Sequence, residues 1–78
     1  MLTCQIISQQ AKVVYDNLES VTLPAVSGKM QILHQHAESY ILLKPGNVKL
    51  KKKNGDEKNI QLNEGVCYLY ANTLTILT

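Results

Sequence analysis

The sequence predicts an all-β fold: a small two-sheet antiparallel β-sandwich, or a flattened barrel, of about eight to ten short strands. Short apolar runs alternate with turn signals about every eight to twelve residues, a spacing typical of such folds. No window of useful length has helical periodicity. The 78 residues suffice for one domain, 1–78, and because Phe and Trp are absent its bulk must come from Ile, Leu, Val and four tyrosines.

The first half of the chain predicts five strands. They are expected over residues 2–8, 13–15, 18–23, 30–33 and 37–43. Residues 8–12 form a turn, and the third strand is expected to end at Pro24 because proline has no amide hydrogen to donate to a ladder. Ser27-Gly28 is the next turn, and Pro45-Gly46 reverses the chain.

The clearest local signal lies in the second half. Val48, Leu50 and Lys52 alternate with the other, polar residues of 47–53, Asn54-Gly55 interrupts this pattern, and Ile60 and Leu62 resume the period. An Asn-Gly pair between alternating strands is the strongest short hairpin signal. After a turn at 63–65, strands at 66–70 and 74–77 form a final hairpin around 71–73.

Charge and cysteine content argue against several function classes. The net charge of +2, without any Arg, is too mild to indicate a nucleic-acid partner. The central hairpin carries its lysines beside two acidic residues and without interleaved aromatics, so it is interpreted as a solvated face; these lysines are Lys49, Lys51, Lys52, Lys53 and Lys58. Cys4 and Cys67 match no metal or redox spacing and are expected to be reduced and buried.

No catalytic, nucleotide or metal site is predicted. The serines follow no nucleophile-elbow pattern, and the four glycines form no phosphate loop. His34 and His36 would share a strand face about 6.6 Å apart, with Glu38 beside them, but a structural zinc site needs four ligands. A His-based metal protein and a lipoyl- or biotinyl-type carrier, with Lys53 beside the hairpin tip, remain alternatives.

One apolar run exceeds what a core requires. Residues 40–43, Tyr-Ile-Leu-Leu, are continuous rather than alternating. Either other parts of the domain cover both faces of this strand, or one face is exposed and is covered by a partner protein. Nothing resembles a signal peptide or a bilayer-spanning segment, so any membrane association is expected only through partner subunits.

Three segments carry a family resemblance. The first is residues 28–37, Gly-Lys-Met-Gln-Ile-Leu-His-Gln-His-Ala; residues 43–46, Leu-Lys-Pro-Gly, follow it, and residues 20–24, Ser-Val-Thr-Leu-Pro, precede it. In this order and spacing they resemble the amino-terminal β-sandwich domain of the epsilon subunit of bacterial F-type ATP synthases. The resemblance extends from Leu2 to Thr78.

The resemblance implies a non-catalytic subunit of the central stalk. Such a subunit links the gamma subunit to the membrane c-ring and couples ion-driven rotation to ATP synthesis. It needs no cofactor, lies at the cytoplasmic face of the bacterial inner membrane, and is expected to be monomeric when isolated.

Site residues follow from the resemblance position by position. The implied gamma-subunit contacts are Ser8, His36, Ala37, Ile41 and Leu42. The implied c-ring contacts are Ser27, Gly28, Lys29, Met30 and Ile32. Three positions depart from the family pattern: Lys29 replaces a frequent Glu, Gln31 a usual Gly, and Glu38 a usual Pro.

The family usually continues beyond the sandwich into a helical hairpin that binds ATP and inhibits rotation. This sequence ends at Thr78, which fits either a naturally short subunit or an excised domain. In both cases residues 1–78 are expected not to bind ATP.

Overall fold

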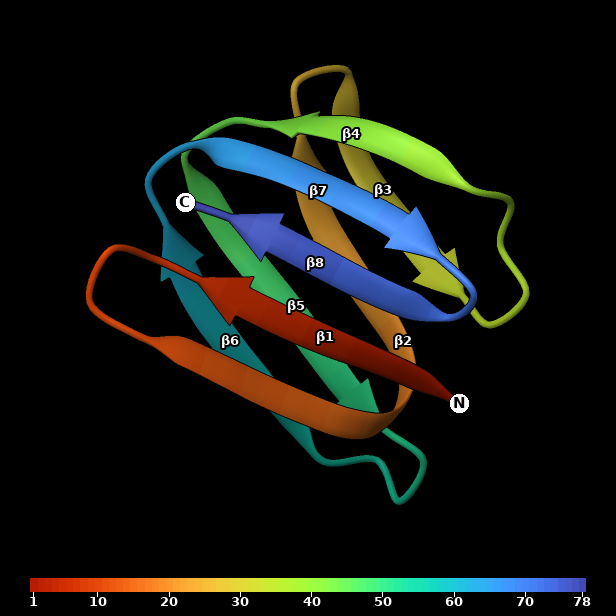
Figure 1. Cartoon of the computed structure of the whole chain (residues 1–78). Helices are drawn as coiled ribbons and strands as arrows, with labels where there is room; N and C mark the ends of the chain where they lie inside the picture. Colours follow the sequence, from red (N-terminus) through yellow and green to blue (C-terminus); the bar gives the residue numbers. More distant parts are fainter.

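The computed structural model describes residues 1–78 and contains eight strands and no helix (Figure 1). The predicted all-β fold is therefore confirmed. The strands are β1 (Leu2–Ile7), β2 (Lys12–Ala25), β3 (Gly28–Leu33), β4 (Ser39–Leu43), β5 (Gly46–Lys52), β6 (Glu57–Leu62), β7 (Gly65–Tyr70) and β8 (Thr73–Leu77).

The strands form one hydrogen-bonded sheet that folds into two layers. Its order is β1-β8-β7-β4-β2-β5-β6, with β3 paired to β2. In Figure 1, β1, β8, β7 and β4 lie in front of β3, β5, β6 and the second half of β2. Every pair is antiparallel except β1 and β8, which run parallel from Thr3↔Thr73 to Ile7↔Leu77. The expectation of a wholly antiparallel arrangement is wrong for this one pair.

Strand β2 joins the two layers. Its first half pairs with β1, and its second half pairs with β3 and β5. Two strands, 13–15 and 18–23, were expected here, but the chain is continuous and 14 residues long. Asn17 has a φ of 55°, and the register with both β1 and β5 shifts near this residue. The turn-like residues before Leu18 therefore form a bulge rather than a chain reversal.

Pro24 does not end β2, contrary to expectation. The strand continues to Ala25, and the Pro24 carbonyl accepts a hydrogen bond of 2.9 Å from the Lys44 amide. The ladder between β2 and β5 has already ended at Thr22, so no amide hydrogen is required of Pro24. Gly46 leaves room for the proline ring, because a Cβ there would lie 2.9 Å from the Pro24 Cβ.

The segment 34–38 is a loop rather than the start of a strand. The structure begins β4 at Ser39, and Gln35 has a φ of 63°. His34 and His36 therefore share no strand face, which corrects the geometry expected for them. Two hydrogen bonds tie the loop to β7 and the turn after it: the Gln35 amide donates to the Asn72 side chain, and the Tyr68 hydroxyl donates to Glu38.

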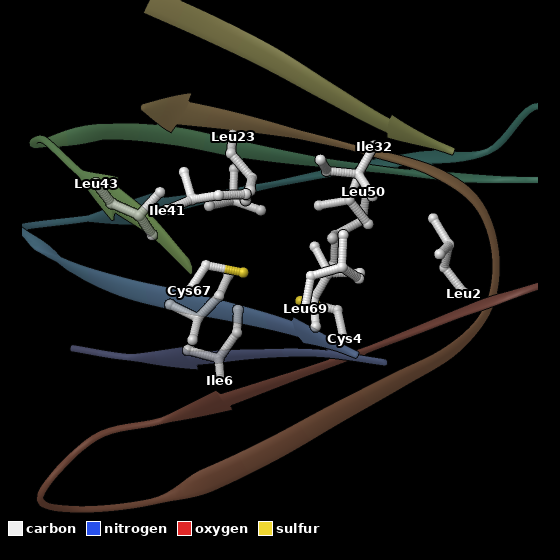
Figure 2. Packing of buried hydrophobic residues seen from close by; sticks show 14 of the residues in the cluster. Leu2, Cys4, Ile6, Leu23, Ile32, Ile41, Leu43, Leu50, Cys67 and Leu69 are labelled. Carbon is white, nitrogen blue, oxygen red and sulfur yellow. The ribbon is translucent and has the colours of Figure 1, made fainter. Parts of the chain in front are cut away.

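The core lies between the layers and contains 17 buried apolar residues. Figure 2 shows side chains from both layers meeting there, among them Ile32 and Leu50 from one layer and Leu69 and Ile6 from the other. Cys4 and Cys67 are buried and free, as predicted. Burial raises the pKa of both thiols to about 12.

Candidate partner-binding faces

The outward side chains of β1, β8, β7 and β4 include no charged residue. Alternation places every second side chain of these strands outside the core. We call this surface the neutral face; it comprises Thr3, Gln5, Ile7, Tyr40, Leu42, Val66, Tyr68, Tyr70, Thr73, Thr75 and Leu77.

The strand register aligns these side chains into rows. One row runs across the layer from Gln5 through Thr75 and Tyr68 to Tyr40. A second row runs from Ile7 through Leu77 and Val66 to Leu42. Because side chains directly opposite each other contact, each row is a continuous strip, and the two strips form one surface.

Three tyrosines dominate this surface. The ring centroids of Tyr40 and Tyr68 are 4.7 Å apart, and those of Tyr68 and Tyr70 are 6.3 Å apart with nearly parallel planes. Tyr40 is 77% exposed and Leu42 is 66% exposed. A contiguous exposed apolar surface with clustered aromatics is characteristic of protein–protein contacts. The surplus apolar run at 40–43 thus has one buried and one outward face.

Glu38 lies at the border of the neutral face. Its carboxylate accepts a hydrogen bond from the Tyr68 hydroxyl. This hydrogen bond, with a smaller effect of desolvation, raises the pKa of Tyr68 to about 12. The bond holds the loop 34–38 against β7 and fixes the central tyrosine of the cluster.

The opposite outer face, on β3, β5, β6 and the second half of β2, is polar. Lys49 pairs with Glu57 at 3.3 Å and Lys51 with Glu19 at 4.0 Å. Exposed ion pairs of this kind contribute about 1 kcal/mol or less. Lys58 differs, because it is in register with buried Leu50 and its ammonium lies 5.2 Å from the centre of the Tyr15 ring, which packs against the core. The interpretation of the central hairpin as a solvated lysine-rich face agrees with this exposure.

The residues expected to contact a gamma subunit do not form one patch. Ser8 lies in the turn after β1, where its hydroxyl hydrogen-bonds with Ala11. His36 and Ala37 lie in the loop before β4. Ser8 is at the other end of this strand, because it follows Ile7, which is level with Leu42. Of the expected residues, only Leu42 belongs to the neutral face.

Ile41 requires a correction. Its side chain is 5% exposed and faces the core, so it does not belong to the outward face of β4. The contact roles implied by the family resemblance take no account of which face of β4 each residue occupies. Two-residue alternation in β4 and β7 is the signal that finds the outward residues, including the missed Tyr40, Val66, Tyr68 and Tyr70.

The residues expected to contact a c-ring are divided among several environments. Ser27 lies with Val26 in the turn of the β2–β3 hairpin, and Gly28, which has a φ of 127°, begins β3. Lys29 is exposed on the polar face and Met30 is half-buried. Ile32 is fully buried in the core, so its expected contact role is corrected. Sequence reasoning missed Val26, which is 62% exposed at the same tip.

An apolar hollow connects this hairpin to the neutral face. It is lined by Ala25, Val26, Ser27, Met30, Tyr40, Ile41 and Leu42. Tyr40 and Leu42 belong to both the hollow and the neutral face. The two candidate contact regions therefore form one continuous surface that turns around β4.

The structure brings no three His, Cys, Asp or Glu side chains close enough to hold a metal ion. It also contains no helix with the length and apolarity needed to cross a membrane.

Comparison with known proteins gives a consistent set of relatives. The sequence matches the family described as "ATP synthase, Delta/Epsilon chain, beta-sandwich domain" over residues 1–78. It is 38% identical over 78 residues to the ATP synthase epsilon chain of Aquifex aeolicus and 29% identical over 76 residues to that of Nitratiruptor. These alignments cover 99% and 97% of this chain, but only 57% and 59% of the relatives. The chain thus spans somewhat more than half the length of these relatives.

Two solved structures share the fold. A chain of the Euglena gracilis mitochondrial ATP synthase superposes with a TM-score of 0.90 at 16% identity, covering 99% of this chain and 49% of that one. A chain of the Tetrahymena thermophila ATP synthase central stalk and c-ring superposes with a TM-score of 0.78 at 18% identity, covering 97% and 61%. At these identities the superpositions show a common fold.

Proposed function

The chain belongs to the ATP synthase delta/epsilon family through its β-sandwich domain, and from this premise we propose that it is a non-catalytic subunit of the central stalk. In this role it links the gamma subunit to the membrane c-ring and helps to couple ion-driven rotation to ATP synthesis. It acts at the cytoplasmic face of a bacterial inner membrane, which it reaches through its partner subunits.

The neutral face is the observation that carries the proposal. Two cross-strand rows place tyrosines, aliphatic side chains and hydroxyl groups over four strands without a charge. Removing charged groups from water is costly, so a surface intended for burial excludes them. We assign the neutral face to the gamma subunit.

The β2–β3 hairpin is the second contact in the proposal. Its tip projects at the edge of the sandwich and carries exposed Val26 beside Ser27 and Gly28 (Figure 1). The apolar hollow makes this tip continuous with the neutral face. A rigid ladder between two contact regions can transmit torque, because bending it would break cross-strand hydrogen bonds. We assign the hairpin tip to the c-ring.

Binding to the purified gamma subunit tests the assignment of the neutral face. Leu42→Glu places a charge on this face, and Leu33→Glu places the same charge on the polar face, where Leu33 is 52% exposed. We expect Leu42→Glu to weaken binding at least about tenfold, because its carboxylate would be buried against gamma. Leu33→Glu should change binding less than about twofold.

Circular dichroism of both variants must first show the wild-type spectrum. Equal losses for the two variants, or unchanged binding of Leu42→Glu, would contradict the assignment. Absence of binding by the wild-type chain to gamma and to the c-ring would contradict the proposed function as a whole.

A further inference from the structure

The β5–β6 hairpin turns through an Asn-Gly pair at the end of the sandwich opposite the β2–β3 hairpin (Figure 1). Its exposed loop consists of Lys53, Asn54 and Gly55. The Lys52 amide donates to the Asp56 carbonyl at 2.8 Å, and this hydrogen bond closes the loop. Gly55 has a φ of 96°, so the loop is a tight turn that ends in a glycine bulge.

An asparagine followed by glycine is the most reactive kind of asparagine in a protein. The backbone nitrogen of the next residue can attack the side-chain amide carbon, and a side chain on that next residue obstructs the approach. Of the six asparagines in this chain, only Asn54 precedes a glycine. The residues that follow the others all carry bulky or branched side chains: Leu18, Val48, Ile60, Glu64 and Thr73.

The folded turn engages every group that would react. The Gly55 N–H, whose nitrogen would attack, donates to the Lys52 carbonyl at 3.0 Å. The Asn54 Nδ2, which would leave, donates to the Asp56 carboxylate at 3.1 Å, and the Asn54 Oδ1 accepts from the Asp56 amide at 3.0 Å. The nitrogen keeps its proton and the side-chain amide keeps its orientation while these bonds persist. The reaction therefore requires the turn to open.

We propose that Asn54 is a site of spontaneous deamidation and that Asp56 holds it in an unreactive geometry in the folded chain. When the turn opens, the Gly55 nitrogen loses its proton to water and bonds to the Asn54 Cγ. The bond from Cγ to Nδ2 breaks, and Nδ2 takes up a proton and leaves as ammonia. Water then opens the resulting succinimide ring at either carbonyl, which gives aspartate or isoaspartate. The reaction consumes one water molecule and needs no oxidant or reductant.

Both products alter the hairpin. A new carboxylate beside Asp56 and Glu57 lowers the net charge of +2 by one unit. Isoaspartate also adds a carbon atom to the backbone of the turn, next to the last ladder pair, Lys51↔Glu57. No residue of this turn belongs to the neutral face or to the β2–β3 hairpin, so the inference does not depend on the proposed function.

Deamidation of the full chain, folded and in concentrated urea, tests the proposal. Both samples are incubated at the same mildly alkaline pH, and conversion is measured by peptide mass spectrometry and by labelling with an isoaspartyl methyltransferase. We expect Asn54 to convert before any other asparagine. The folded chain should convert at least about tenfold more slowly than the unfolded chain, because only the open fraction of the turn reacts.

Two variants isolate the role of Asp56. In the folded chain, Asp56→Ala should accelerate conversion about threefold, as expected for the loss of one exposed hydrogen bond. In urea the same substitution should have no effect, because the contact is absent there. Glu57→Ala is the matched control: it removes a neighbouring carboxylate that pairs with Lys49 rather than with Asn54, and it should leave the rate unchanged.

Circular dichroism must show the wild-type spectrum for both variants, whereas the comparison of folded and unfolded wild type needs no variant. Earlier conversion of another asparagine, or no conversion in urea, would refute Asn54 as the site. Equal rates for folded and unfolded wild type would refute protection by the turn. An unchanged folded rate in Asp56→Ala, or an equal acceleration in Glu57→Ala, would refute the role of Asp56.

Discussion

Tyr68 links the loop before β4 to the neutral face. Its ring contacts those of Tyr40 and Tyr70, and its hydroxyl donates to Glu38. A phenol that donates to a carboxylate resists ionisation, because the phenolate would lose the hydrogen bond and face a like charge. This single interaction therefore positions the aromatic cluster and holds the loop.

The titration of Tyr68 should depend on Glu38. We expect Tyr68 to ionise near pH 12, and Glu38→Gln to lower its pKa toward the ordinary value of 10. The measurement is the tyrosine ring resonance in NMR spectra, assigned with Tyr68→Phe. Glu64→Gln, which removes a distant carboxylate, serves as the control. An unchanged Tyr68 titration in Glu38→Gln would refute this account of the hydrogen bond.

Among the elements, β4 and β7 show how alternation divides a strand between core and partner. In β4, Ile41 and Leu43 are buried while Tyr40 and Leu42 are exposed; β7 repeats the pattern. Because every residue of 40–43 and 66–70 is apolar, the sequence did not show which alternate set faces the core, and the structure decided it. Strand β2 differs, because it contributes to both layers. It bends at Asn17, which has a positive φ, so that its two halves pair with strands of different layers.

The glycines at two turns should differ in their tolerance of alanine. A Cβ at Gly65 would clash with the Leu77 carbonyl oxygen, so the backbone would have to move where β7 meets β8. Gly55 has open space but a φ of 96°. We expect Gly65→Ala to lower the free energy of unfolding by about 3 kcal/mol and Gly55→Ala by about 1 kcal/mol.

Urea denaturation of both variants measures this difference. The two substitutions add the same methyl group, so each serves as the chemical control for the other. A larger loss for Gly55→Ala would mean that the left-handed turn, rather than the closely packed start of β7, limits stability.

At the scale of the whole molecule, one sheet closes around one core. Pairing of β1 with β8 joins the two ends of the chain, and β2 joins the two layers. The buried side chains of Cys4 and Cys67 belong to this same core. We therefore expect the domain to unfold in a single cooperative transition.

Stability should fall in alkaline solution. The pKa of each thiol is about 12 in the folded chain against 9.0 ordinarily, so above pH 9 the unfolded chain releases these protons first. The stabilisation is complete below pH 9 and is lost as the pH rises toward 12, by on the order of 2 kcal/mol per thiol at pH 11.

Thermal denaturation between pH 7 and pH 11 measures this loss. The variant that combines Cys4→Ala and Cys67→Ala should be less stable at pH 7 because of the cavities, but should lose less stability between pH 9 and pH 11. An equal alkaline loss in wild type and variant would contradict a role of the thiols.

The sequence by itself determined the all-β class, most strand positions, the Asn54-Gly55 hairpin and the family, because alternation and turn chemistry are local properties. The continuity of β2 through Asn17 and Pro24 depended on neighbours distant in the chain, namely β1, β3 and β5. Only the tertiary structure decided that Ile41 and Ile32 are buried, that the loop 34–38 separates the two histidines from any strand, and that Lys29 and Lys44 line one hollow. Burial and convergence are set by which strands become neighbours, and strand pairing between distant segments has no local signature.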